Sequence, residues 1–553
     1  MNDSMLWLAA EVLGLLTAYW VSDVLFRRET FYQFVARLGA SHRVSSYLLA
    51  AGAIGLTLFF PWPAEVGHLA IFGAIHASMM AWKSGTDDID VARGEAWWTE
   101  RALLLACGIG AWFSPAWIPL QMHLTSRPFI GWKHHGSLPL RVLQLCFAFA
   151  VLATFGLVAN ISAFLVALFM MLGSHYVPTA IAKSLLGPRW YSWMLDNKLF
   201  YVAASSYRWG WARFLTPKAW TRVLKLFEFL NRPMQIAAWV AEAASPLMLL
   251  HPNAAIGLCG TIAVFHVAVF ISTGIFFWEW TVTNLLVIGL VLTTAPEILD
   301  LSFGVLPWVL SAMLMVALPL RGKLWDPNPL GWWDTPLTQR VSWRVIGESG
   351  TVYGLHNDFM CPHERNYGRV QGCFMIDEIV FTYHLGEVWR IDLRDDIRSL
   401  RDHPERLSEI RAKYGISVAE PNQAAQHERY LKRFLQQINR GARKYVFPRW
   451  LRWLKAPGGQ FYYWGDRPSF KGQERAVEVQ FWYTEEYWDG EVHHQFQEKM
   501  LHSFQVEDEL IEEPCEECDE KVIDAMVIQR ANGRLVFAPE WIVDRSRDLY
   551  QPS

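Results

Sequence analysis

The amino-acid sequence divides near residue 320 into an apolar part and a polar part. Before this point, apolar runs of roughly 18–22 residues follow one another, which is the length that crosses the hydrocarbon core of a bilayer. After it such runs stop, and residues 321–553 hold 31 Lys and Arg against 37 Asp and Glu, a net charge of −6 in a chain whose total is −3. We therefore expect a polytopic membrane domain over 1–320 and a soluble α+β domain over 321–553, the latter large enough for its own core.

The apolar runs predict an α-helical bundle of about ten membrane spans. Their approximate ranges are 5–26, 44–62, 66–82, 102–120, 141–158, 160–178, 233–250, 254–275, 277–295 and 301–320. Trp and Tyr residues flank many of these runs, as interfacial anchors do. The pattern predicts an integral multi-pass membrane protein, which we expect in a bacterial inner membrane. The side on which the soluble domain lies stays open.

Two basic stretches interrupt this pattern. The loop 183–232 holds nine Lys and Arg against two acids and mixes them with aromatic residues, which is typical of short helices that lie at a membrane surface. Residues 429–455 carry nine basic residues and no acidic one. Nucleic acid is one partner for such a stretch, but in a chain tied to a bilayer we favour docking on anionic headgroups.

The polar part predicts both strands and helices. Residues 341–353, 370–393, 476–483 and 521–537 are rich in β-branched and aromatic residues, with turn breaks such as Ala531-Asn-Gly533. Residues 397–414 and 422–444 have helical periodicity. This mixture indicates an α+β fold.

Three ionisable residues lie within apolar runs or at the end of one, where a charge is costly. Lys183 closes the sixth run, Glu242 lies within the seventh and His266 within the eighth. A lysine held away from water titrates low and can serve as a base, whereas one that reaches the headgroups is only an anchor. Glu242 is either a buried acceptor or half of an ion pair, and His266 is either a packing residue or a site residue.

The order of three motifs resembles the HTTM family of membrane domains, which includes the vitamin K-dependent γ-glutamyl carboxylases. The first is the stretch from Tyr176 through Lys183 to Trp190, similar to the family's apolar segment with a lysine and a later Trp. The second is Glu242-Ala-Ala-Ser-Pro246. The third is Phe265-His266 with a later Phe. The likeness covers roughly residues 5–300, and nothing in 321–553 matches the carboxylase's substrate-binding portion.

The resemblance implies a catalytic role for Lys183, Glu242 and His266. Lys183 would be the base that deprotonates a reduced quinone, and His266 would shape the pocket. His76, assigned by position alone, and Trp190 would bind the cofactor. The implied activity is that of a quinol-dependent oxygenase or lyase acting on a lipophilic small molecule or on a protein substrate.

A metal site is a competing hypothesis for the soluble domain. Cys361 and His363 lie close together, and Cys515 and Cys518 have the Cys-x-x-Cys spacing of a zinc knuckle. Together these four residues could hold zinc. The cysteines could equally form disulfides or remain free.

Two functions without this chemistry also fit the sequence. One is a non-enzymatic membrane scaffold or assembly protein whose soluble domain binds a protein partner. The other is a transporter with Glu242 and His266 on its pathway, although no inverted halves support it.

Overall fold

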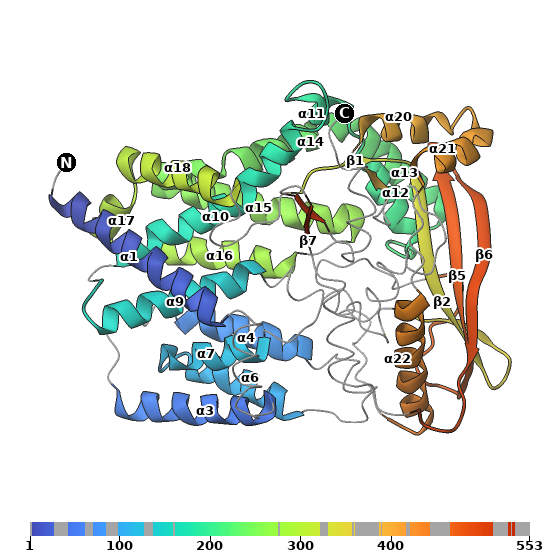
Figure 1. Cartoon of the computed structure of the whole chain (residues 1–553). Helices are drawn as coiled ribbons and strands as arrows, with labels where there is room; N and C mark the ends of the chain where they lie inside the picture. The colour runs from blue at the N-terminus through green and yellow to red at the C-terminus, as the bar shows by residue number, and fades with distance from the viewer. Residues whose placement is uncertain are drawn as a thin grey trace.

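The computed structural model describes most of the chain. The described residues are 3–26, 42–60, 70–84, 98–125, 137–158, 161–274, 277–320, 330–356, 359, 386–388, 390–415, 421–442, 465–511, 529–531 and 534–536. Among the described residues, those up to 320 form mainly helices, and those after it form a sheet with further helices (Figure 1).

The helical part contains the following elements: α1 Asp3–Phe26, α3 His42–Phe59, α4 Ala70–Ser84, α6 Trp98–Gly110, η2 Pro115–Trp117, α7 Ile118–Thr125, α9 Ser137–Thr154, α10 Ile161–Ser184, α11 Ser192–Asp196, α12 Phe200–Arg208, α13 Pro217–Phe229, α14 Asn231–Ala243, η3 Ser245–Leu250, α15 Pro252–Thr273, α16 Trp278–Thr293, α17 Pro296–Ser302 and α18 Val305–Leu320.

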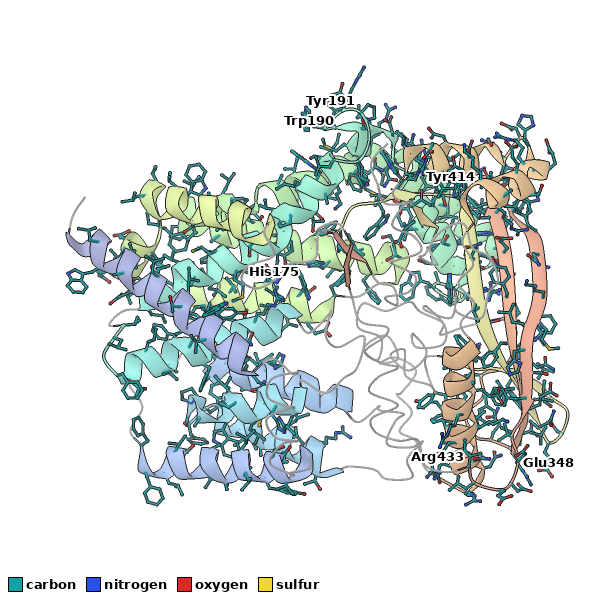
Figure 2. All side chains as sticks on the ribbon, in the orientation of Figure 1. His175, Trp190, Tyr191, Glu348, Tyr414 and Arg433 are labelled. Carbon is teal, nitrogen blue, oxygen red and sulfur yellow. The ribbon has the colours of Figure 1, made fainter. Side chains whose placement is uncertain are left out.

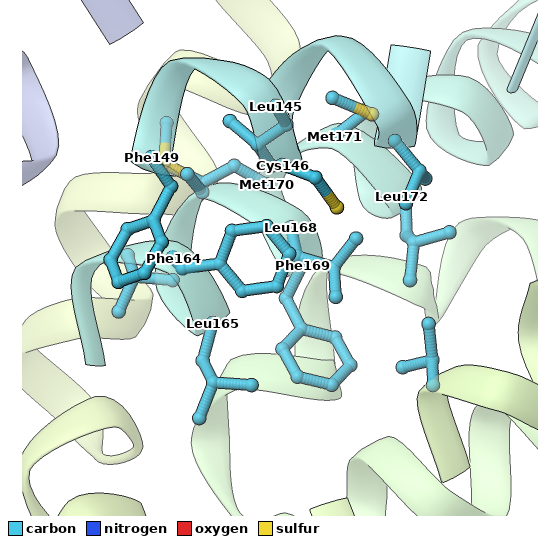
Figure 3. Packing of buried hydrophobic residues seen from close by; sticks show 14 of the residues in the cluster. Leu145, Cys146, Phe149, Phe164, Leu165, Leu168, Phe169, Met170, Met171 and Leu172 are labelled. Atoms are coloured by element: carbon cyan, nitrogen blue, oxygen red, sulfur yellow. The ribbon is translucent and has the colours of Figure 1, made fainter. Parts of the chain in front are cut away.

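Helix α10 lies at the centre of this part. Its residues from Ile161 to Ala180 are buried, and helices α1, α9, α14, α17 and α18 pack around it. Apolar side chains from α9 and α10 fill the space between the two helices (Figure 3), and the rings of Phe149 and Phe164 lie 5.5 Å apart. A helix that is apolar on all sides must be enclosed by protein or lipid, and here protein encloses most of it.

The C-terminal part is built on one antiparallel sheet. Its elements are β1 Trp333–Asp334, β2 Leu337–Gly347, β3 Val352–Gly354, β4 Glu387–Val388, α20 Ile391–Ser399, η6 Pro404–Arg406, α21 Leu407–Tyr414, α22 Pro421–Asn439, β5 Ala476–Trp488, β6 His493–Gln505, β7 Gln529–Ala531 and β8 Arg534–Val536. The main sheet has the order β3-β2-β5-β6, and β1 pairs with β4, as β7 does with β8.

The sheet lies between two groups of helices. On one face, α12 and α13 approach from the helical part, with the hydroxyls of Ser205 and Thr338 2.6 Å apart. On the other face, Phe481 and Trp343 pack against His427 of α22. Most residues of β2 and β5 are buried on both faces rather than at alternate positions, because helices cover both faces of the sheet.

The prediction of about ten spans is wrong. Among the described residues, two helices are long and apolar enough to cross a membrane, Ile161–Ser184 and Pro252–Thr273. A third is added if the bent pair Glu279–Thr293 and Pro296–Ser302, which meet at 118°, counts as one span. The remaining apolar helices in the described residues are shorter, such as Leu6–Ser22 and Arg141–Thr154.

Breaks in the helices explain the difference at two of the predicted spans. The predicted span 233–250 stops being α-helical at Ala244 and continues as the 3-10 helix η3, whose second residue is Pro246. The predicted span 301–320 contains a break at Gly304, where φ is +135°, and leaves a helix of 16 residues. Hydropathy counts apolar residues in a window, but it does not detect breaks of the helix inside that window.

Candidate functional site

Lys183 and Glu242 form a buried ion pair. Lys183 lies in the last turn of α10, and its ammonium donates hydrogen bonds to both carboxylate oxygens of Glu242, at 2.6 and 2.7 Å. The side chains are only 10% and 6% exposed. The ring of Trp193 lies 4.8 Å from the ammonium nitrogen. The amine is therefore held away from bulk water, between a carboxylate and an aromatic face.

Contacts between α10 and α14 hold this pair in place. Glu242 lies in the last turn of α14, where the Ser245 hydroxyl donates to its backbone carbonyl at 2.7 Å. The Trp239 indole, one turn earlier, donates to the Ser184 hydroxyl at 2.9 Å and to the Ala180 carbonyl at 3.2 Å. The Trp239 hydrogen bonds join the two helices beside the ion pair, so its geometry does not depend on the two charged side chains alone.

Gly331 and Trp332, which directly precede β1, pack against the site. A Cβ atom at Gly331 would lie 2.9 Å from the carbonyl carbon of Ala182 and 3.0 Å from the backbone nitrogen of Lys183, so this position requires glycine. The next carbonyl, of Trp332, accepts a hydrogen bond from the Trp193 indole at 2.8 Å. The chain entering the sheet thus packs directly on the turn that carries Lys183.

A second polar group lies beside the pair. Asn197 donates from Nδ2 to the Asp334 carboxylate at 2.6 Å and accepts from the Asp334 backbone N–H at 2.8 Å. Asp334 lies opposite Glu387 in the β1–β4 ladder. Burial raises the pKa of the Asp334 carboxyl to about 7, although hydrogen bonds from Asn197 and Trp332 favour its charged form. Burial and the neighbouring Asp334 charge raise the pKa of Glu387 well above its ordinary value.

His266 belongs to a different polar cluster. Its Nε2 lies 3.5 Å from the Tyr176 hydroxyl, which accepts a hydrogen bond from Asn284 Nδ2 at 2.9 Å. The rings of Phe277 and Trp280 lie 5.4 and 5.9 Å from the His266 ring. Tyr176 precedes Lys183 by seven residues, so the two clusters share a face of α10 about two turns, or roughly 10 Å, apart.

The remaining predicted membrane residues lie elsewhere. His76 is buried on α4, where its Nδ1 lies 2.6 Å from Gln121 Nε2 of α7, in a different helix group from Lys183. Trp190 is 59% exposed and packs against Tyr191 and Trp239, with both ring distances 5.5 Å. Figure 2 shows Trp190 and Tyr191 together at one end of the molecule, while His175 lies among the helices.

The predicted zinc ligands cannot be placed. Cys361, His363, Cys515 and Cys518 all lie outside the described residues. Within the described ranges, no group of three or more His, Cys, Asp and Glu side chains is arranged to hold a metal ion. The zinc site stays a prediction.

The structure also brings in residues that the sequence did not single out. Trp193 contacts the ammonium of Lys183, and the charge of Lys183 acts on Asp334, which bonds Asn197. Tyr176 contacts His266 and bonds Asn284. A signal existed for Asn284, because it is an amide within the apolar run 277–295. Asp334 gave a weaker signal as the acid that follows Gly331-Trp-Trp, directly after the last apolar run.

Comparison with known proteins finds no match to this chain. No family model, no curated protein and no solved structure matches the chain.

Proposed function

We propose that this chain is a membrane-bound enzyme of the HTTM type in which Lys183 withdraws a proton from a lipophilic hydroquinone. The observation that carries the proposal is the buried amine, held by both oxygens of an equally buried carboxylate at the end of an apolar helix. The motif order that resembles the HTTM family supports the same residue as base. The two candidate spans α10 and α15 support a location in a membrane, and the bacterial inner membrane is part of the proposal.

The ion pair gives the amine a way to become a base. An ammonium and a carboxylate that are both removed from water have lost much of their hydration, so the neutral amine with a protonated carboxyl becomes accessible. In that form Glu242 holds the proton and the Lys183 nitrogen has a lone pair. The hydroxyl of a bound hydroquinone then gives its proton to this nitrogen, which leaves a substrate anion beside a lysine ammonium.

Three further groups have defined parts in this proposal. Trp193 covers the ammonium and stabilises its charge after the transfer. Asp334, beyond Asn197, carries a carboxyl whose raised pKa lets it exchange protons near neutral pH. Tyr176, about two turns before Lys183 on α10, and His266 beside it would contact the far end of a long substrate.

A conservative substitution tests the base role. Arginine can make the same two hydrogen bonds to Glu242, but it stays protonated, so Lys183→Arg should fold normally and lose activity. The matched control is Lys218→Arg, at an exposed position of α13. Each purified protein is mixed with a reduced naphthoquinone in detergent and oxygen, and the loss of the reduced form is followed.

The outcomes separate the enzyme from its alternative. Wild type and Lys218→Arg should consume the quinol above the protein-free rate, and Lys183→Arg should fall by about 100-fold or more, as when a general base is removed. The proposal is wrong if Lys183→Arg consumes the quinol as fast as wild type does.

A scaffold is the second candidate function. Strand β6 is the edge of the main sheet in the described part of the chain, and along its 13 residues most positions are exposed or half-buried. Such an edge offers backbone hydrogen-bonding groups to an extended segment of a partner protein. This candidate gains support if no protein in the series consumes quinol while Lys183→Arg remains as stable as wild type.

A further inference from the structure

Helix α14 carries its polar side chains on the inner side and apolar side chains on the outer side. Asn231, Gln235 and Glu242 are spaced four and seven residues apart, so they share one face of the helix, and all three are buried. Ile236 and Val240, four residues apart, lie on the other side, and both are exposed. A helix at the surface of a protein in water has the reverse arrangement, so α14 is suited to an apolar surrounding.

The exposed apolar surface of α14 extends to the end of α10. The Trp239 indole donates to the Ser184 hydroxyl at 2.9 Å, which places the next residue, Leu185, beside α14. The ring of Trp190 packs on that of Trp239, 5.5 Å away. Leu185 and Trp190 are both exposed, and Trp190 lies at the outer end of the molecule (Figure 2). The α14 surface consists of Leu185, Trp190, Ile236 and Val240.

A candidate membrane span adjoins this surface. Helix α14 packs on α15, and only the 3-10 helix η3 and His251 separate the end of α14 from Pro252, where α15 begins. Along α15, Val264, Val267 and Ile271 are exposed with spacings of three and four residues, so they form an apolar face. Lipid that surrounds α15 would therefore reach the helix that packs directly on it.

Basic side chains gather where α13 meets α14. Arg222 and Lys225 are exposed on α13, three residues apart on one side of the helix, and Arg232 is exposed in the first turn of α14. Phe229 and Leu230, between these basic residues, are exposed as well. Basic side chains next to exposed apolar ones are typical of the boundary between acyl chains and headgroups.

Acidic residues nearby do not balance this charge. Over 183–232, nine Lys and Arg stand against Asp196 and Glu228. Lys225 Nζ lies 3.5 Å from Glu491 Oε1, but both side chains are more than half exposed, so solvent screens this pair. In the described part of the chain, the corner between α13 and α14 thus carries net positive charge, which attracts anionic headgroups.

We propose that the α14 surface lies against the acyl chains of a bilayer, with Arg222, Lys225 and Arg232 at the anionic headgroups. A bilayer is favoured over a protein partner because a candidate span adjoins the surface and basic side chains border it. The 13 residues of α14 extend about 20 Å, less than the hydrocarbon core, so the proposal concerns lipid contact and not a further span. It does not depend on the function proposed for Lys183 and Glu242.

Photo-crosslinking of the full chain in bilayers tests the apolar contact. Val240 is replaced by p-benzoylphenylalanine, which bonds to a neighbouring C–H group on irradiation. The matched control is the same replacement at Met500 of β6, because Val240 and Met500 are both 48% exposed. Ile236, on the same side of α14, is the second position should the Val240 replacement fail to fold. The bilayers hold equal amounts of phosphatidylcholine and phosphatidylglycerol, and adducts are identified by mass spectrometry.

The expected result is a mass increase of one phospholipid at Val240 and none at Met500. The proposal is overturned if neither Val240 nor Ile236 gives a lipid adduct, or if Met500 gives the same yield. A crosslink from Val240 to a second copy of the chain or to another protein, in place of lipid, would also overturn it, because it would assign the surface to a protein partner.

The headgroups of the adducts test the basic corner. With the crosslinker at the exposed Phe229, phosphatidylglycerol should be enriched among the adducts relative to its share of the bilayer. Each of Arg222→Gln, Lys225→Gln and Arg232→Gln should lower this enrichment by up to about fivefold, because each removes one basic side chain near the headgroups.

The matched control for charge is Lys471→Gln. Lys471 is exposed five residues before β5 begins, whereas α13 packs near Trp488 at the other end of that strand. This substitution should leave the enrichment unchanged. The headgroup contact is overturned if the adducts at Phe229 have the composition of the bilayer, or if all three corner variants match the Lys471→Gln control.

Discussion

The Lys183–Glu242 pair makes a quantitative prediction about stability. Removing one member of a buried, fully hydrogen-bonded ion pair leaves the other charge without compensation, which costs about 3–5 kcal/mol. We therefore expect Lys183→Met and Glu242→Gln each to lower the free energy of unfolding by about that amount. The double variant leaves no buried charge, so it should be no less stable than either single variant, whereas independent effects would total about 6–10 kcal/mol.

The stabilities of wild type, the two single variants and the double variant are measured by equilibrium unfolding in detergent micelles, followed by far-ultraviolet circular dichroism. The control Lys218→Met removes an exposed charge and should change stability by less than about 0.5 kcal/mol. Additive effects of the two substitutions would refute the reasoning, because they would show that the side chains do not depend on each other. Small effects in both single variants would refute it too, because both charges would then be solvated.

Three further predictions concern the residues around the pair. Asp334 has a folded-state pKa of about 7 against an ordinary value of 3.8, so between these pH values the native state binds one more proton than the unfolded state, and the free energy of unfolding falls as the pH rises. This fall is at most about 4 kcal/mol in total, and Asp334→Asn should remove it. An unchanged pH dependence in urea titrations from pH 4 to pH 7 would contradict the assignment. Gly331→Ala should cost about 1–3 kcal/mol, because its methyl group would meet the backbone of Ala182 and Lys183, and a midpoint equal to that of wild type in thermal melts would argue against this packing. Asn197→Ala removes two hydrogen bonds to Asp334 and should lower the free energy of unfolding by about 2 kcal/mol. The measured sign is an unfolding midpoint at a lower denaturant concentration than that of wild type.

The sequence predicted the position of the helices better than their role in a membrane. Apolar runs correctly marked α10 and α15, where no break interrupts the run. They failed at 233–250, since Pro246 follows a helix end that local hydrogen bonding sets at Ala244. The other helices bury some of their apolar side chains against protein and leave others exposed, such as Leu48 of α3 at 67% and Leu292 of α16 at 69%. Composition does not separate a helix that packs on protein from one that contacts lipid.

The polar part shows a similar limit. The predicted strand 476–483 lies within β5, and the helix predicted over 422–444 corresponds to α22. Strand β6 was missed because His493-His-Gln-Phe-Gln-Glu-Lys lacks the β-branched residues that mark a strand. It becomes a strand by pairing with β5 at eleven positions between His493 and Gln505, which is a tertiary effect that local propensity does not contain.

The candidate site was predictable only in part. Lys183 and Glu242 were both singled out because ionisable residues in apolar runs are costly, and they contact each other across 59 positions of the sequence. His266 was singled out for the same reason, but it packs against Tyr176 rather than the ion pair. Sequence spacing gives no information on which of several polar residues on different helices will meet.

The absorption spectrum of a reduced naphthoquinone bound without oxygen tests the central claim most directly, because the hydroquinone and its anion absorb at different wavelengths. With wild type and with Lys218→Arg we expect the anion spectrum at neutral pH, since the Lys183 amine takes the hydroxyl proton. With Lys183→Arg we expect the spectrum of the intact hydroquinone. The same neutral spectrum with all three proteins would contradict the account, and so would the anion spectrum with all three.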